Sequence, residues 1–335
     1  MVALLDVCDL AVTYHGTRGD VPAVRGVDLT LDVGETLGIA GESGCGKSTL
    51  ALALLRLLPA GTTVTGQVLL DGDDVLAMSW GQLRAVRWAG SSIVFQGAMH
   101  ALNPVHRIGR QIAEPILLHE EVTEAQAHQR AADLLTQVGL PTWRAASYPH
   151  ELSGGQRQRV MIAMALACSP RLIIADEATT ALDVMIQAQV LDLIAGLVAE
   201  RGIGLLMISH DLSVLSSTCA RLAVMYAGRV VEVGPARSVF TSPAHPYAGA
   251  LAAAFPTIGD PNSRGRPRGL GGDPPDPAAI PSGCPFHPRC PVVLPECSTA
   301  DVGLWPVDGG DRHAACVRAA GAPPLSSGSR CGTGQ

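Results

Sequence analysis

Residues 41–48 carry the strongest chemical pattern in this sequence, because they read Gly-Glu-Ser-Gly-Cys-Gly-Lys-Ser. This order fits the phosphate-binding pattern G-x-x-x-x-G-K-[ST] at every fixed position. Glycines allow the backbone to bend so that successive N–H groups face a phosphate. The lysine brings a charge to the β- and γ-phosphates, and the hydroxyl after it can ligate Mg²⁺. The predicted phosphate-binding residues are Gly41, Ser43, Gly44, Cys45, Gly46, Lys47, Ser48 and Thr49.

The segments on either side of this loop agree with the interpretation. Residues 36–40 are mostly apolar and predict a buried strand, and residues 49–58 predict a helix that Pro59 and Gly61 end. A strand, a loop and a helix in this order place the helix N-terminus against the anion. A glycine-rich turn that matches by chance would lack this context.

Two acids follow another apolar run. Residues 172–175 predict a core strand, and Asp176 and Glu177 come directly after it. An acid at the end of a core strand can hold Mg²⁺, and the next acid can activate water as a general base. The alternative is two solvated acids at a strand end, and the phosphate loop in the same chain argues against it.

Polar side chains also end two further predicted strands. Gln96 follows residues 91–95 and is placed to touch Mg²⁺ or the attacking water, although taken alone it is more typical of an ordinary loop. His210 follows the strand predicted over residues 204–208 and could donate to the γ-phosphate. A lone histidine is usually structural, but this one is predicted at the same sheet edge as the other candidates.

A second glycine pair opens another helix. Ser153, Gly154, Gly155 and Gln156 precede an apolar helix predicted over residues 157–167. Backbone N–H groups at such a start, together with the helix dipole, attract an anion. One chain cannot easily place two such sites on one phosphate, which indicates sharing between two subunits.

The remaining elements frame these sites. Alternating runs in residues 1–35 predict an antiparallel patch, and Tyr14 at a strand end either stacks on adenine or is a half-buried edge residue. Position alone favours neither. From residue 97 to about residue 150 the pattern is helical, with one helix predicted over residues 124–138, which indicates a helical insertion.

Composition limits the class of protein. The chain has 335 residues, 47% of them hydrophobic, and a net charge of −6, which is an ordinary α/β profile and gives no support to nucleic acid as a main partner. No apolar run reaches the length of a membrane span, and the N-terminus has no basic segment typical of a secretory signal. We therefore expect a cytosolic protein.

The C-terminal part is different in character. Residues 259–283 are rich in proline and glycine and predict a linker or an irregular wrap. Four cysteines then cluster within a short stretch: Cys284, Cys290, Cys297 and Cys316. In a reducing cytosol such a cluster indicates a metal site rather than disulfides. Four thiolates suit a [4Fe–4S] cluster or Zn²⁺, the latter with His287 or His313 as substitute ligands, and the spacing matches neither a ferredoxin run nor a zinc ribbon. Structural cysteines without a metal are the third alternative.

Taken together, these motifs over residues 3–255 resemble the ATP-binding subunits of ABC transporters. Residues 41–48 match the Walker A motif, 152–156 the signature sequence and 172–177 the Walker B motif; Gln96, residues 181–183 and His210 match the Q-loop, D-loop and switch histidine. Tyr14 takes the place of the adenine-stacking aromatic residue. Departures are Gly97, where an acid is usual, and Ala178, where proline is usual.

This resemblance implies an α/β fold, with a RecA-like parallel sheet, an antiparallel β patch, a helical subdomain and an irregular Cys-rich extension. The implied domains are an ATP-binding domain over residues 1–255, with its helical subdomain at about 97–156, and an extension over residues 256–335. Two such subunits would bind two ATP molecules head to tail, each site joining the Walker motifs of one subunit to the signature loop of the other. The implied roles are phosphate binding by Lys47, Mg²⁺ placement by Ser48, Gln96 and Asp176, water activation by Glu177, charge stabilisation by His210, and capping from across the interface by Ser153 and Gly155.

A narrower resemblance is to the oligopeptide and dipeptide importer ATPases. It is carried by residues 34–38, 101–104, 148–151, 245–247 and 283–291. It implies a [4Fe–4S] cluster in the tail, two membrane permease subunits, a second and related ATPase chain, an extracytoplasmic substrate-binding protein, and a peripheral place on the cytoplasmic side of the membrane. An ATPase for nickel or another solute is the alternative, ahead of a soluble ABC ATPase.

Overall fold

The computed structural model describes residues 3–17, 19–95, 101–178, 184–254, 270–307 and 310–319. The chain divides into two compact, discontinuous units. The first unit holds residues 1–4, 31–36 and 70–208, and the second holds residues 5–30, 37–69 and 209–335. The division predicted after residue 255 stays a prediction.

Three parallel strands form the centre of the first unit. They are β6 (Ser91–Val94), β7 (Leu172–Asp176) and β8 (Gly204–Ser209), with β7 in the middle. All residues of β7 and β8 are buried, which explains why their sequences are runs of apolar residues rather than alternating ones. Because the strands are parallel, their carboxyl ends lie at one edge of the sheet.

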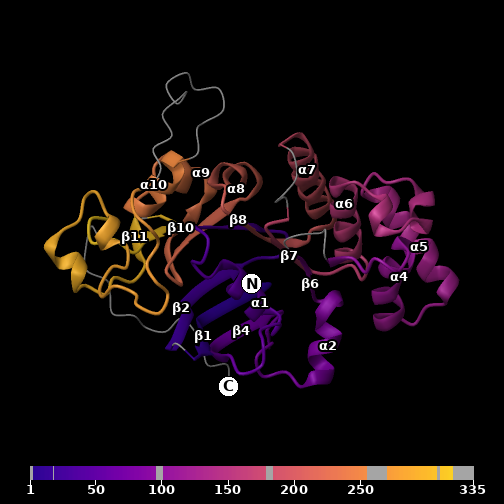
Figure 1. The fold of residues 1–335 in the computed structure, drawn as a ribbon, viewed down its shortest axis with the longest axis horizontal. Coiled ribbons are helices and arrows are strands. Elements are labelled where there is room, and N and C mark those ends of the chain that lie inside the picture. The colour runs from indigo at the N-terminus through magenta and orange to yellow at the C-terminus, as the bar shows by residue number, and fades with distance from the viewer. Residues whose placement is uncertain are drawn as a thin grey trace. The chain divides into compact units, whose positions relative to one another are not determined.

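Helices make up the rest of the first unit. They are α2 (Trp80–Ala89), α4 (Ile108–His119), α5 (Glu124–Gln137), α6 (Gly154–Ala165) and α7 (Val184–Arg201), with a two-residue β5 (Asp73–Asp74) and 3₁₀ turns at Thr142–Ala146 and Pro149–Glu151. The helices α4, α5 and α6 pack against one another (Figure 1). Thr123 and Gln126 form a capping box at the start of α5, the helix predicted over residues 124–138.

The second unit contains two groups of strands. In one, β1 (Leu5–Gly16) lies between β2 (Gly19–Leu31) and β4 (Thr63–Leu70). In the other, the order is β11 (Trp305–Val307), β12 (Arg312–Ala314), β10 (Arg229–Pro235), β9 (Arg221–Tyr226) and β3 (Thr36–Ala40). β3 runs parallel to β9, and the other pairs are antiparallel. The helices are α1 (Lys47–Leu54), α8 (Leu212–Thr218), α9 (Ala236–Thr241) and α10 (Pro246–Ala254).

Two predicted helices begin earlier than expected. The helix predicted over residues 49–58 spans Lys47–Leu54, and the one predicted over 157–167 spans Gly154–Ala165. Both begin inside a glycine-rich motif, because the loop backbone turns directly into the first helical turn. The first also ends early, since Arg56 adopts a φ of 49°.

The extension that the sequence predicts as irregular also has short regular elements. The extension contains β11, β12 and 3₁₀ turns at His287–Arg289 and Pro295–Ser298. β12 pairs with β10, with Ala314 opposite Glu232 and His313 opposite Val233. Strands of three residues are too short to show an alternating pattern in the sequence.

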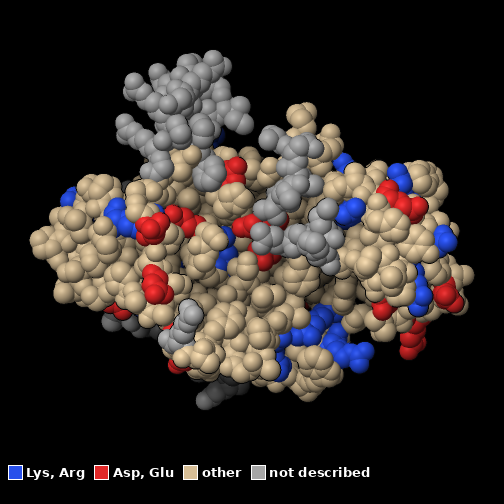
Figure 2. Space-filling view, viewed as in Figure 1, with Lys and Arg blue, Asp and Glu red and all other residues tan. Residues whose placement is uncertain are grey.

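Of the helices in the described ranges, none is long and apolar enough to cross a membrane. On the face shown in Figure 2 the surface is mostly uncharged, with scattered acidic and basic side chains and one group of basic side chains near the lower edge. The net charge of −6 is therefore not gathered into one patch on this face.

Candidate functional site: the phosphate loop and its surroundings

The loop between β3 and α1 needs glycine for steric reasons. Gly44 and Gly46 have φ values of 79° and 105°, in the left-handed region that side chains disfavour. A Cβ atom on Gly46 would also lie 2.2 Å from the carbonyl oxygen of Ala23. The pattern of residues 41–48 is thus a backbone shape as well as a set of functional groups.

Helix α1 begins directly at the end of this loop. Gly46 is its N-cap residue, and no side chain caps it among the residues that the structure describes. The first intrahelical bond runs from the N–H of Leu50 to the carbonyl of Gly46 at 2.9 Å. The amides of the first turn and the positive end of the helix dipole therefore lie at the loop. Together they make this helix end a site that attracts an anion.

Lys47 lies over the loop rather than in solvent. Its side chain is buried, with 5% of the residue exposed. The ammonium Nζ donates to the carbonyls of Gly41 and Glu42 at 2.8 and 2.9 Å. These two bonds hold the charge at the centre of the loop, where it can meet the oxygens of a phosphate.

Cys45 fills space in the loop. Its Sγ lies 3.7 Å from Lys47 Nζ, and the residue is buried. Burial raises the pKa of the Cys45 thiol in spite of the nearby ammonium. A protonated, buried thiol is a poor nucleophile, so this cysteine acts as a small apolar filler rather than as a redox group.

Tyr14 lies beside the start of α1. It comes from the C-terminal end of β1, it is half-buried, and its hydroxyl donates to Oγ1 of Thr49 at 3.2 Å. The side chain proposed to stack on adenine thus lies next to the phosphate loop. Its role in stacking on adenine stays a prediction.

The paired acids belong to the first unit. Asp176 is the last residue of β7 and is buried, opposite Ile208 of β8. Glu177 follows with a φ of 46°, and its N–H donates to the carbonyl of Ile208 at 3.0 Å. A non-glycine residue in this strained conformation at a sheet edge fits a functional position, because the surroundings must impose it. Ala178, which stands where proline is usual, is buried.

The signature residues open α6, also in the first unit. Ser153 is the N-cap: its hydroxyl accepts from the N–H of Gln156, and Gln156 Oε1 accepts from the N–H of Ser153 at 3.1 Å. A Cβ atom on Gly155 would lie 2.6 Å from Cγ2 of Ile186 in α7. This glycine therefore allows two helices to approach closely.

His210 of the second unit is exposed and comes immediately before Asp211, the N-cap of α8. Gln96, Gly97 and residues 181–183 lie outside the described residues, so their predicted roles stay predictions.

The structure reveals loop contacts that the sequence patterns did not predict. Glu42, a variable position of the loop, donates its N–H to the hydroxyl of Tyr247 at 2.9 Å. Its carboxylate accepts two bonds from the guanidinium of Arg289, at 2.8 and 3.0 Å. Both partners lie in segments quoted for the peptide-importer resemblance, but nothing in their local spacing indicates a contact with the loop.

The four clustered cysteines line one cavity. All four are free thiols, and Cys297 and Cys316 are buried, whereas Cys284 and Cys290 are half-buried. The N–H of Cys284 donates to the carbonyl of Cys297 at 2.8 Å. Within the described ranges, however, no group of three or more His, Cys, Asp or Glu side chains is arranged so that it could hold a metal ion. The thiols therefore fit a metal by donor type and common location, not by the geometry present here.

A phosphate loop at a strand–helix junction, with paired acids on a parallel strand, defines the class of P-loop nucleotide-binding proteins. Two families match this chain: ABC transporter over residues 24–180, and the oligopeptide/dipeptide transporter C-terminal region over residues 231–297. A probable peptide ABC transporter ATP-binding protein, y4tR of Sinorhizobium fredii, is 47% identical over 304 residues, covering 88% of this chain and 89% of that protein. The oligopeptide transport ATP-binding protein OppD of Escherichia coli is 45% identical, covering 89% and 88%.

Solved structures agree with these relatives. A dimeric, ADP- and phosphate-bound form of the ATP-binding cassette MJ0796 matches with a TM-score of 0.63 and 28% identity, covering 70% of this chain and 99% of that one. The cassette cbiO1 of Clostridium perfringens matches with a TM-score of 0.61 and 27% identity, covering 72% and 92%. The chain belongs to the ABC transporter ATP-binding proteins and is an ATPase of that family.

Proposed function

We propose that this chain is the ATP-hydrolysing subunit of an importer for dipeptides or oligopeptides. The observation that carries the peptide assignment is the match of residues 231–297 to the oligopeptide/dipeptide transporter C-terminal region, a segment beyond the matched cassette at residues 24–180. Relatives named for peptide transport also match over most of their length. ATP binding closes a dimer of ATPase subunits, and hydrolysis reopens it.

The proposed partners follow from this role. They are two membrane permease subunits, a second and related ABC ATPase, and an extracytoplasmic substrate-binding protein that acts through the permease. The chain then works at the cytoplasmic side of the membrane. Nickel or another small solute is the competing cargo.

The proposed chemistry assigns one task to each group. Lys47 and the amides of residues 44–49 hold the phosphates, and Tyr14 stacks on adenine. Mg²⁺, when bound, neutralises phosphate charge, and Ser48, Gln96 and Asp176 would hold it. Glu177 takes a proton from the attacking water, His210 stabilises charge at the γ-phosphate, and Ser153 and Gly155 of a second subunit cap it. The buried Lys47 ammonium and the strained backbone of Glu177 support these assignments.

The chemical part of the proposal is tested with Glu177→Gln. This variant keeps size and hydrogen bonding but removes the base, so we expect ATP binding to persist while hydrolysis falls on the order of 10²- to 10⁴-fold. Its ATP-bound dimer with the related ATPase subunit should persist in size-exclusion chromatography, whereas the wild-type dimer decays as ATP is consumed. Hydrolysis at the wild-type rate would refute Glu177 as the base.

The cargo is tested in proteoliposomes that contain the complete transporter and its substrate-binding protein. We expect ATP hydrolysis to rise when a mixture of short peptides is added and to stay at its basal rate with Ni²⁺. The Glu177→Gln variant in the same vesicles is the control for contaminating ATPases. Stimulation by Ni²⁺ alone would overturn the peptide assignment and leave the ATPase assignment intact.

We also propose that Cys284, Cys290, Cys297 and Cys316 hold a [4Fe–4S] cluster, with Zn²⁺ as the alternative. Their common cavity and their soft donor atoms support this, and the N–H of Leu294 approaches Cys297 Sγ at 3.5 Å, as amides do at cluster sulfurs. Burial raises the pKa of the Cys284 and Cys290 thiols, so binding a metal must release protons. The side chains would have to move to complete a site.

The metal is identified by anaerobic purification followed by metal analysis and absorption spectroscopy. A broad visible band with about four irons per chain, lost in Cys290→Ser but kept in Cys219→Ser, would support the cluster. A colourless protein with one zinc would replace it by the zinc alternative. The absence of any metal would refute both.

A further inference from the structure

We propose that Arg289 of the C-terminal extension is a positioning residue for the phosphate loop, so that the extension is part of the nucleotide site. The ion pair between Arg289 and Glu42 joins residues 247 positions apart in the chain. The phosphate-binding pattern does not require this ion pair, because position 42 is variable in the pattern. The inference rests on ATP binding by this chain, not on its cargo.

Every polar group of Glu42 is engaged. Its N–H donates to Tyr247, and its carbonyl accepts from Lys47 Nζ at 2.9 Å and from the N–H of Cys45 at 3.3 Å. Its carboxylate accepts both bonds of the Arg289 fork. Since the same residue contacts the phosphate-binding lysine, a shift of Glu42 moves an acceptor of Lys47.

Arg289 is itself held firmly. Its side chain is only 7% exposed, its Nε donates to the carbonyl of Gly271 at 3.0 Å, and Nη1 donates to the hydroxyl of Tyr226 at 3.3 Å. The guanidinium lies 5.9 and 6.0 Å from the ring centres of Tyr226 and Phe286. A planar guanidinium held by four hydrogen bonds in this way has one conformation, which is what a positioning residue requires.

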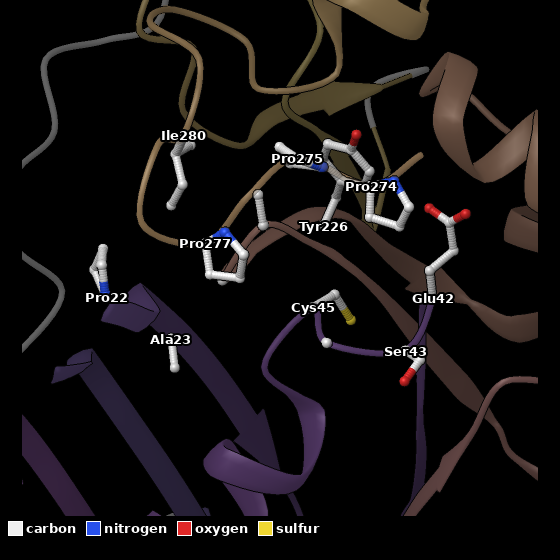
Figure 3. Close-up of a pocket in the computed structure, with 13 residues that line it drawn as sticks. Pro22, Ala23, Glu42, Ser43, Cys45, Tyr226, Pro274, Pro275, Pro277 and Ile280 are labelled. Atoms are coloured by element: carbon white, nitrogen blue, oxygen red, sulfur yellow. The ribbon is translucent and has the colours of Figure 1, made fainter. Parts of the chain in front are cut away.

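An aromatic cluster connects the two segments. Tyr226 of β9, Tyr247 of α10 and Phe286 of the extension pack with ring centres 4.5 to 5.3 Å apart, and all three are fully buried. Figure 3 shows the neighbouring wall, where Pro274, Pro275, Pro277 and Ile280 lie opposite Ser43 and Cys45 across a small pocket. The extension therefore covers one side of the phosphate loop with rigid and apolar residues. It is also bonded to the loop through the ion pair between Arg289 and Glu42.

This arrangement couples the loop to the extension. Arg289 raises the fraction of molecules whose loop is ready to bind phosphate. Loss of Arg289 lowers this fraction, and the apparent affinity for ATP falls in the same proportion. Coupling of this kind is reciprocal, so bound ATP must also order the extension.

The first test measures the ATP dissociation constant with a fluorescent ATP analogue. We expect Arg289→Ala to weaken binding about tenfold, and Arg289→Lys to give an intermediate loss, because a lysine keeps the charge but not the fork. Asp301→Asn is the matched control: it removes the ion pair between Asp301 of the extension and Arg229 of β10, and it leaves Arg289 and Glu42 in place. It should bind ATP as the wild type does.

A double-mutant cycle separates positioning from general damage. If the pair acts as a unit, Glu42→Gln should weaken binding in the wild-type background but add little in Arg289→Ala. Additive losses would overturn the proposal, as would an Arg289→Ala protein that binds ATP within twofold of the wild type.

Hydrogen exchange provides a readout that does not depend on affinity. In the wild type, ATP should slow exchange of the amides in residues 284–297, and in Arg289→Ala at saturating ATP this protection should be lost. Unchanged protection would refute the coupling. Failure of peptide transport in the vesicle experiment would leave these results unaffected, so the two proposals fail separately.

Discussion

The hydroxyl of Tyr247 accepts a hydrogen bond of 2.9 Å from the backbone N–H of Glu42, inside the phosphate loop. Tyr247 is completely buried, and burial raises its pKa, so the hydroxyl is neutral at every physiological pH. Tyr247, at the start of α10, thus holds the backbone of Glu42, and Arg289 holds the side chain of the same residue.

Replacing this tyrosine tests the support. Tyr247→Phe keeps the ring and removes the acceptor of the Glu42 N–H, so we expect the free energy of unfolding to fall by ~1–3 kcal/mol. We also expect weaker ATP binding, measured with the same fluorescent analogue. Tyr148→Phe is the control, because the ring contact with Arg107 is kept. Unchanged stability and affinity in Tyr247→Phe would show that the bond is dispensable.

Tyr14 offers a test of adenine recognition. Tyr14→Phe removes only the hydroxyl that donates to Thr49, whereas Tyr14→Ala also removes the ring. Stacking of a base on an aromatic side chain contributes ~1–3 kcal/mol. We therefore expect Tyr14→Phe to bind ATP nearly as the wild type and Tyr14→Ala to lose about tenfold or more, while affinity for tripolyphosphate changes little in either. Equal losses for ATP and tripolyphosphate would contradict a stacking role.

His245 predicts an acid-sensitive step in stability. Burial lowers the pKa of His245 to about 4, and its Nδ1 accepts from the N–H of Tyr247 at 3.0 Å, which needs the neutral ring. In the unfolded chain the pKa of histidine is ~6.5. Between these two pKa values the unfolded state binds more protons than the folded state. The stability that comes from keeping His245 neutral is therefore complete above pH ~6.5 and is lost as the pH falls toward 4. The loss is on the order of 3 kcal/mol.

The measurement is urea unfolding of wild type and His245→Asn at pH 7.5 and 4.5. Asparagine can supply an acceptor near the Nδ1 position without titrating, so the variant should lose less stability than the wild type over this interval. Glu232, whose carboxylate accepts from the N–H of His245, is present in both proteins and cancels in the comparison. The exposed His128→Asn should behave as the wild type. Parallel losses in His245→Asn and wild type would contradict the prediction.

The isolated cysteines of the core should resist thiol reagents. Burial raises the pKa of Cys168 to about 11 and that of Cys219 to about 12. At pH 8 the thiolate of Cys168 is then about one part in a thousand, and the reaction requires the thiolate. Mass spectrometry after labelling with iodoacetamide should find both residues modified only when the protein is unfolded in urea. Rapid, complete labelling of either one in the native protein would refute this.

Much of the candidate site follows from the sequence because its chemistry is local. Residues 41–48 specify a backbone shape through glycines at fixed positions, and the strand and helix around them follow from short apolar patterns. The positions of Asp176 and Glu177 at a strand end follow in the same way. The start of α1 was less predictable, since the first helical turn is shared with the loop itself.

Only the tertiary structure shows what surrounds the loop. No periodicity or spacing indicates that Arg289 meets Glu42, that Tyr247 accepts from the same residue, or that β12 pairs with β10. Nor do the intervals between the four cysteines show that they line one cavity. Such contacts depend on where distant segments are brought together by the burial of apolar side chains, here Tyr226, Tyr247 and Phe286. Short-range patterns specify the functional groups of this protein, and long-range packing decides which residues hold them in place.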